Sequence, residues 1–131
     1  MITVEAEANP TESGEKVKKA IENLFGNMQI QTRTEKDITL IVATANSKDN
    51  LTRLYNILRR ERIRAAARRV LLEGLEKKTI VFCLNKQVAY AGQVSFSNDV
   101  AESPLGPLRV RIESNDPRAL VDWLTRMERE G

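Results

Sequence analysis

The sequence contains no histidine, a single cysteine and few aromatic residues, and each shortage excludes a class of function. Histidine titrates near neutrality without help, so its absence excludes Ser-His and Cys-His nucleophile activation and every zinc site that contains histidine. The lone Cys83 can form neither an internal disulfide nor a thiolate metal cage. No apolar run approaches the roughly 18 residues that a transmembrane helix needs. We therefore expect a cytoplasmic protein with no membrane segment, metal site or cofactor.

The length and composition predict one globular domain that spans residues 1–131. The chain has 41% hydrophobic and 30% charged residues, and at this length it can bury roughly two thirds of the surface that its unfolded form exposes. It contains no low-complexity tract of the kind that stays disordered. A packed hydrophobic core is therefore expected.

Positive charge is concentrated in one segment. Seven arginines lie between Arg53 and Arg69 with Glu61 as the only acid, so this stretch carries a charge of +6. The other 114 residues hold 14 basic and 17 acidic side chains, which gives −3 and leaves the whole chain at +3. Arginine suits phosphate because its planar guanidinium donates two parallel hydrogen bonds. The segment predicts a surface that meets a polyanion.

Hydrophobic periodicity predicts an alternation of strands and helices, and hence an α+β fold. The expected strands cover residues 2–7, 28–34, 39–45, 79–84, 93–96 and 108–114. The expected helices run from Asn9 or Ser13 to Phe25, from Ser47 through the arginine segment to Gly74, and onward from Asp116, with a short helical turn at 88–91. Glu12 is expected to reach back to the cap at Asn9. The unbroken apolar run 40–43 predicts a central strand that is covered on both faces.

The arginine segment is predicted to form two helices rather than one. Leu51, Leu54 and Leu58 share one helical face, whereas Ala67 and Leu71 share a face rotated by roughly a third of a turn. A break at 59–62 reconciles the two apolar stripes. The arginines off the second stripe, which we expect to point to solvent, are Arg62, Arg64, Arg68 and Arg69.

Polar residues gather at the end of the strand 79–84. Asn85, Lys86 and Gln87 follow this strand directly, where a rigid sheet would position them and the next turn would leave them exposed. The strand 108–114 adds Arg109 and Arg111 on its polar face. These positions are candidates for function.

A proline-rich loop precedes that strand. In the segment 97–107, Pro104 and Pro107 fix φ on either side of Gly106, which can take a positive value. A constrained entry into the next strand explains this loop better than a ligand site does.

Four separated motifs carry a resemblance to a known family. They are Asn9-Pro10-Thr11-Glu12 with the helix after it, Leu84-Asn85-Lys86-Gln87, Pro104-Leu105-Gly106-Pro107, and Asp116-Pro117 with Asp122-Trp123-Leu124. In this order they resemble a small archaeal family of uncharacterised proteins described as RNA-binding or as predicted exosome subunits. The resemblance implies a homodimer and a fold similar to the 5S rRNA-binding protein of the large ribosomal subunit, with an antiparallel sheet that helices cover on one face.

The leading hypothesis is a non-enzymatic RNA-binding protein, linked to RNA processing or to the ribosome. Its phosphate contacts are expected from Arg59, Arg60, Arg62, Arg64, Arg68 and Arg69, with Lys86 and Arg109 as outer contacts. Among the aromatic residues, only Tyr55 and Tyr90 lie at positions that do not belong to the expected core, so they alone are candidates for stacking on bases. Recognition of RNA shape and phosphate is therefore expected rather than recognition of bases.

Three other interpretations stay open. In the first, the arginines solvate a helix and pair with acids elsewhere in the fold. In the second, the chain is an assembly or scaffold protein whose basic helix docks on an acidic protein partner, or the arginines meet an acidic face of a second copy of the chain. In the third, the protein is a magnesium-dependent enzyme built around Glu12, Asn85 and Lys86, which requires these residues to converge in one pocket with a pair of carboxylates.

Overall fold

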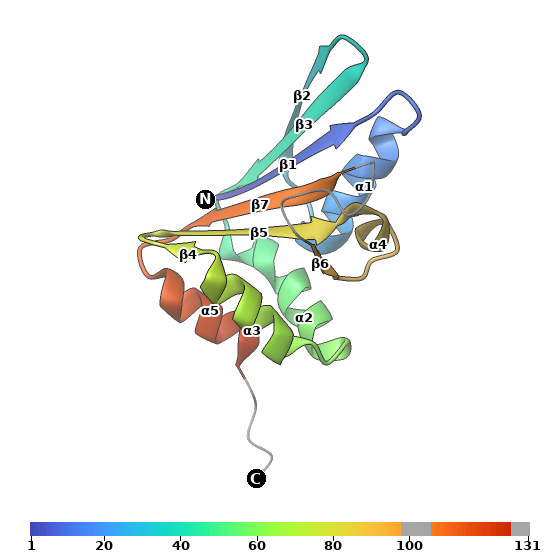
Figure 1. Ribbon diagram of the computed structural model, residues 1–131. Coiled ribbons are helices and arrows are strands. Elements are labelled where there is room, and N and C mark those ends of the chain that lie inside the picture. The colour runs from blue at the N-terminus through green and yellow to red at the C-terminus, as the bar shows by residue number, and fades with distance from the viewer. Residues whose placement is uncertain (98–105, 127–131) are drawn as a thin grey trace.

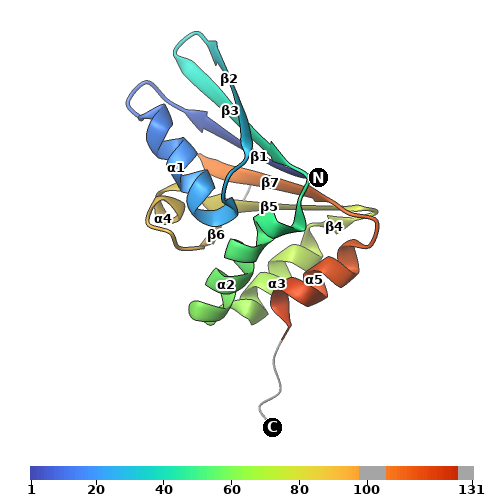
Figure 2. The same cartoon turned by 180° about the vertical axis from the view of Figure 1, so that it is seen from behind.

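The computed structural model describes residues 1–97 and 106–126, which form a seven-stranded antiparallel sheet with helices on one face. The strands are β1 Ile2–Ala8, β2 Gln29–Glu35, β3 Ile38–Ala45, β4 Leu75–Glu76, β5 Thr79–Asn85, β6 Phe96–Ser97 and β7 Pro107–Glu113. The helices are α1 Gly14–Phe25, the 3₁₀ helix η1 Lys48–Leu51, α2 Thr52–Arg60, α3 Arg64–Glu73, α4 Lys86–Tyr90 and α5 Pro117–Thr125. Figures 1 and 2 show these helices on the same side of the sheet. The expected α+β class is confirmed, while the likeness to the ribosomal protein stays a prediction.

The strand order is β2-β3-β1-β7-β5-β4, with β6 paired to β5. The first strand of the chain is therefore internal, and Ile2 lies opposite both Ala45 of β3 and Ile112 of β7. The prediction that residues 40–43 form a central strand covered on both faces was wrong. The strand β3 lies next to the edge strand β2, and its Ile41 and Ala43 are buried whereas Leu40 and Val42 are half-buried.

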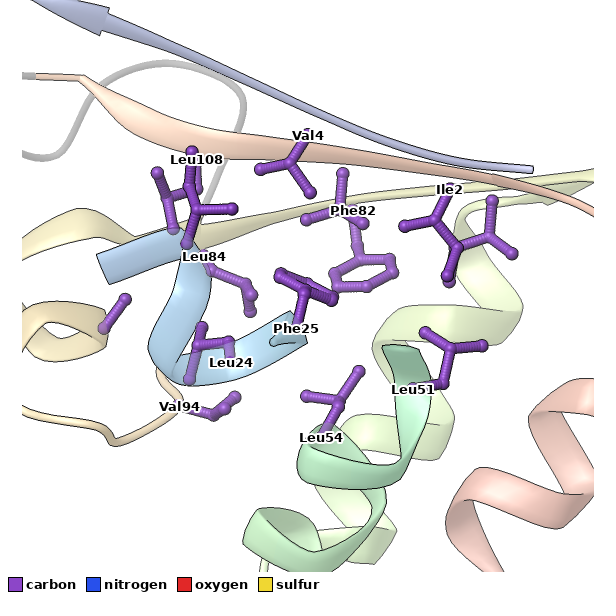
Figure 3. Packing of buried hydrophobic residues seen from close by; sticks show 14 of the residues in the cluster. Ile2, Val4, Leu24, Phe25, Leu51, Leu54, Phe82, Leu84, Val94 and Leu108 are labelled. Carbon is purple, nitrogen blue, oxygen red and sulfur yellow. The ribbon is translucent and has the colours of Figure 1, made fainter. Parts of the chain in front are cut away.

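The hydrophobic core fills the space between the sheet and the helices. The strands contribute alternate residues, because successive side chains point to opposite faces of a sheet. Figure 3 shows this packing, in which the labelled residues are Ile2, Val4, Phe82, Leu84 and Leu108 from the strands, Leu24 and Phe25 from α1, Leu51 from η1, Leu54 from α2, and Val94. The helices are thereby fixed relative to the sheet.

The predicted break in the arginine segment is confirmed, and it has a defined geometry. Arg62 adopts a left-handed conformation with φ 57°. Its backbone N–H donates to the carbonyl of Arg59 at 3.2 Å, and the N–H of Ile63 donates to the carbonyl of Leu58 at 3.1 Å. These two bonds form a Schellman motif that closes α2. An arginine in this conformation costs about 1 kcal/mol, so the surrounding packing maintains the turn.

Some boundaries agree with the predictions and others differ. The first helix begins after Ser13, which is one of the two predicted starts. Glu12 Oε1 also accepts the predicted hydrogen bond from the backbone N–H of Asn9, at 3.1 Å. The short helix α4 begins at Lys86 rather than Val88, because the Asn85 side chain accepts from the N–H of Val88 and caps it.

The short strands differ from the predictions, whereas the glycine of the proline-rich loop agrees with them. The two-residue strand β4 was not predicted, and β6 occupies Phe96–Ser97 instead of 93–96. Gly106 has the expected positive φ, at 76°. Pro104 lies outside the described residues. None of the helices in the described ranges is long and apolar enough to cross a membrane.

Gly74 joins α3 to the sheet at a point where no side chain fits. Its carbonyl accepts a hydrogen bond from the N–H of Val81 on β5 at 3.0 Å. A Cβ atom built on Gly74 would lie 1.9 Å from the carbonyl oxygen of Val81. A glycine is therefore required here by close approach of two backbones.

We predict that Gly74→Ala lowers the free energy of unfolding by at least about 2 kcal/mol, because the helix must move away from the sheet to admit the methyl group. Urea denaturation measures the change. Gly14→Ala is the matched control, since a Cβ atom there meets nothing within 4 Å and should leave stability unchanged or slightly raised. Equal stability of the Gly74→Ala and wild-type proteins would contradict this account.

Candidate functional site

Part of the arginine segment holds helix ends rather than facing solvent. Arg59 donates to the carbonyls of Leu124 and Arg126 at 3.2 and 3.4 Å, and Arg64 donates to the carbonyl of Arg126 at 2.9 Å. The last carbonyls of a helix have no partner within the helix and carry its negative dipole end. These two guanidinium groups therefore cap the C-terminal end of α5.

Arg53 has the same role at another helix. Its guanidinium donates to the carbonyl of Glu22, in the last turn of α1, at 2.9 Å. The Asn50 side chain donates to the carbonyls of Phe25 and Asn27, both at 2.8 Å. The segment 50–53 thus closes the C-terminal end of α1.

Two stacked aromatic rings, with a cation at each end of the stack, join α2 to α5. The Arg59 guanidinium lies 3.3 Å from the ring centroid of Tyr55, which stacks on Trp123 at 4.6 Å, and the Lys48 ammonium lies 4.4 Å from the Trp123 ring. Cations stabilise such rings by their attraction to the negative π face. Tyr55 is therefore already engaged inside the protein and is poorly placed to stack on a base.

The expectation that Arg64 and Arg68 point to solvent was wrong. Both are half-buried, and Arg68 forms an ion pair with Asp122 of α5 at 2.6 Å and donates to the Thr125 hydroxyl at 3.3 Å. A helical wheel reports the apolar face of one helix, but it cannot show that a neighbouring helix covers part of the polar face.

Within the arginine segment, three arginines after Arg53 are exposed: Arg60 and Arg62 at the turn between α2 and α3, and Arg69 in the middle of α3. We call them the outer arginines. Arg60 donates to the carbonyl of Gly92 at 3.2 Å, and neither Arg62 nor Arg69 forms an ion pair with a described residue. The only acid of the segment, Glu61, accepts a hydrogen bond from the N–H of Val94 at 3.3 Å. The charge of the outer arginines is thus not balanced within the segment.

Arg109 lies elsewhere on the molecule. It is exposed on β7, where it stands opposite Glu5 of β1 and Cys83 of β5. These positions alternate with the buried residues Leu108 and Val110, so Arg109 belongs to the face of the sheet opposite the helices.

Lys86 is buried, contrary to the expectation that the polar cluster after β5 is exposed. Only 5% of this lysine is accessible. Its ammonium donates to the carbonyl of Glu7 at 2.6 Å and to both carboxylate oxygens of Glu12 at 3.1 Å. The backbone and side-chain nitrogens of Asn9 donate to the same carboxylate at 3.1 and 3.2 Å. Two motifs 74 residues apart therefore meet in one buried ion pair.

A pocket of about 420 Å³ opens beside this ion pair, between α1 and α4. Its lining residues are Thr11, Glu12, Ser13, Lys16, Val17, Ala20, Lys86, Gln87 and Tyr90. The sequence indicated Glu12, Lys86 and Gln87 but gave no signal for Lys16, whose position depends on how α4 packs against α1. Asn23 fixes that packing, since its side chain donates to the carbonyls of Ala89 and Tyr90 at 3.3 and 2.9 Å.

The described residues of the pocket do not supply the pair of carboxylates that a magnesium enzyme requires. Glu12 and Lys86 converge as that interpretation demanded, but Glu12 is the only carboxylate among the described lining residues and is matched by Lys86. Asn85 uses its side chain to cap α4. Across the described ranges, no group of three histidine, cysteine, aspartate or glutamate residues could hold a metal ion. The donor set therefore does not favour the magnesium interpretation.

We predict that Glu12→Gln destabilises the protein by about 3 kcal/mol, because it leaves a buried ammonium without its counter-charge. Chemical denaturation measures the change. Glu15→Gln is the matched control, since its ion pair with Lys18 is exposed and should contribute little. If the two variants unfolded at the same denaturant concentration, the structural role of the Glu12–Lys86 pair would be refuted.

Comparisons with known proteins agree with the resemblance of the four motifs. A family model described as RNA binding matches residues 1–114. The chain is 43% identical over 124 residues to a UPF0201 protein of Sulfurisphaera tokodaii and 42% identical over 124 residues to one of Sulfolobus acidocaldarius, in each case covering 95% of this chain and 86% of the relative. The crystal structure of a UPF0201 protein from Methanococcus jannaschii is similar with a TM-score of 0.86 at 27% identity, covering 98% of this chain and 94% of that chain. The chain therefore belongs to the archaeal UPF0201 family, whose model is described as RNA binding.

Proposed function

We propose that this protein binds RNA through the phosphate backbone, with the outer arginines as its principal contacts. The observation that carries the proposal is the exposure of Arg60 and Arg62 at the turn between α2 and α3 and of Arg69 in the middle of α3, with the neighbouring acid Glu61 turned toward the backbone of Val94. The family description supports RNA as the polyanion. Ribosomal RNA and exosome substrates are the classes that the motif resemblance implies.

Arg59, Arg64 and Arg68 are proposed to hold α3 in place rather than to contact RNA. Arg59 and Arg64 are committed to the end of α5, and Arg68 is paired with Asp122. They add positive potential near the outer arginines, but their hydrogen bonds are already formed. In this proposal they position α3, and the outer arginines make the phosphate contacts.

Lys86 and Arg109 have no direct part in the proposed contact surface. Lys86 is buried with Glu12, and Arg109 lies on the other face of the sheet. The scarcity of exposed aromatic rings also limits base stacking, because Phe25 and Phe82 are buried and Tyr55 is stacked on Trp123. Recognition at the outer arginines is therefore directed at phosphate and helix shape rather than at sequence.

We predict that the double variant Arg62→Glu/Arg69→Glu weakens binding to a short RNA duplex by at least about tenfold, because each charge reversal removes a phosphate contact and adds repulsion. The slope of log affinity against log salt should fall by about two. Fluorescence anisotropy at several salt concentrations measures both quantities, and duplexes of different sequence should bind equally.

The control is Lys77→Glu/Lys78→Glu, which makes the same change in net charge in the exposed turn between β4 and β5. This turn follows the C-terminal end of α3 by way of β4 (Figure 1), whereas Arg60 and Arg62 precede the N-terminal end of α3. Equal losses in the two double variants would show that only net charge matters. An unchanged affinity of Arg62→Glu/Arg69→Glu would contradict the proposal and favour an acidic protein partner for this surface.

We also propose that the protein forms a homodimer through β2. This strand is a sheet edge, and six of its seven residues are exposed, with Ile30 half-buried. Edge strands offer unpaired backbone groups to a second chain. Antiparallel pairing of two copies about Thr34 places Arg33 of one copy opposite Glu35 of the other, and these side chains already attract each other within one chain at 2.9 Å.

For this dimer we expect Arg33→Glu to lower the dimer fraction, because Glu then faces Glu across the two-fold axis. The exchange Arg33→Glu/Glu35→Arg should restore it. Light scattering coupled to gel filtration measures the mass of each variant. A monomeric wild-type protein, or a dimer that Arg33→Glu leaves intact, would refute pairing through β2.

A further inference from the structure

The pocket between α1 and α4 is separate from the outer arginines, and its lining suits a nucleotide. Its volume of about 420 Å³ lies in the usual range of small-molecule sites. Its lining combines the ring of Tyr90 with the side chains of Thr11, Ser13 and Gln87, and the buried Val17 and Ala20 lie beneath it. Such a mixture binds ligands that have an apolar ring and polar substituents.

Tyr90 gives the pocket an accessible aromatic ring. All six aromatic residues of the chain lie in the described part, and Tyr90, at 47% exposure, is the one among them that is exposed. The Asn23 side chain donates to the Tyr90 carbonyl at 2.9 Å, which holds this end of α4 against α1. A fixed and accessible ring is a stacking platform, because every base presents a π face.

The pocket also carries an unbalanced positive charge beside that ring. The Lys16 ammonium lies 5.7 Å from the Tyr90 ring centroid and forms no ion pair with a described residue. The charge of Lys86 is balanced by Glu12. The first turn of the twelve-residue helix α1 adjoins the pocket, and the Ser13 side chain does not cap it. Lys16 thus already lies over the Tyr90 ring, and a base that stacks on this exposed ring would replace that contact while its phosphate pairs with the ammonium.

The pocket is connected to the outer arginines through a short piece of backbone. Tyr90 is followed two residues later by Gly92, and the carbonyl of Gly92 accepts a hydrogen bond from Arg60 at 3.2 Å. Arg60, one of the outer arginines, is therefore close to the end of α4 that carries Tyr90.

We propose that this pocket holds one unpaired terminal nucleotide of RNA, with its base against Tyr90 and its phosphate beside Lys16. This inference rests on the proposed function. The inference adds to the proposed RNA-binding function a second site, which distinguishes an RNA with a single-stranded end from a blunt duplex.

The first test uses adenosine 5′-monophosphate, adenosine and inorganic phosphate as separate probes in calorimetric titrations. The monophosphate should bind more tightly than either of the other two. Tyr90→Ala and Lys16→Gln should each weaken its binding about tenfold. Tyr90→Phe retains the ring and should bind normally, as should the control Lys19→Gln, which alters an exposed lysine of α1 outside the pocket lining.

The second test compares a blunt RNA duplex with one that has a single-stranded overhang. Tyr90→Ala should weaken binding of the overhang duplex alone, whereas Arg62→Glu/Arg69→Glu should weaken binding of both duplexes and leave the monophosphate unaffected. Failure of the wild-type protein to bind the monophosphate would overturn the pocket assignment. So would equal affinity of wild type and Tyr90→Ala for the overhang duplex, even if the outer arginines prove necessary for RNA binding.

Discussion

The left-handed turn at Arg62 determines which arginines hold the protein together and which face solvent. It ends α2 with two hydrogen bonds and redirects the chain into α3. Without this reversal a single helix would carry all the arginines of the segment around its circumference. With it, Arg59 and Arg64 both reach the end of α5, while Arg62 and Arg69 are exposed on the other side. A segment that is one basic run in the sequence thus both holds helices together and exposes positive charge to solvent.

Arg53, Arg59 and Arg64, which donate to carbonyls at helix ends, show why a cluster of positive charge is not in itself evidence of a nucleic-acid surface. The C-terminal end of a helix is negatively polarised, and an arginine fork can satisfy two carbonyls at once. In this fold Arg59 donates to two carbonyls at the end of α5, and Arg53 donates to one in the last turn of α1, so both join helices that are distant in the sequence. The case for RNA rests on the exposed Arg62 and Arg69, which form no such hydrogen bond with a described residue, and on the exposed Arg60, together with the family to which the chain belongs.

The sequence predicted local structure well and packing between elements poorly. The α+β class, the two-helix arginine segment and the reach of Glu12 back to Asn9 followed from periodicity and cap chemistry, which depend on neighbours in the chain. The ion pair of Lys86 with Glu12, the pairing of Arg68 with Asp122 and the place of β3 near the sheet edge depend on tertiary contacts. Periodicity carries no information about such contacts. Glu12 and Lys86 both belong to motifs of the family resemblance, but only the structure shows that their side chains are in contact.

The division of roles within the arginine segment can be observed directly by NMR. The Nε–H signals of the arginines are assigned and then followed while a short RNA duplex is added. The account predicts that the signals of Arg62 and Arg69 shift in proportion to bound RNA, while those of Arg59 and Arg64 stay in place. Large shifts of Arg59 and Arg64, or no shift at the outer arginines, would contradict it.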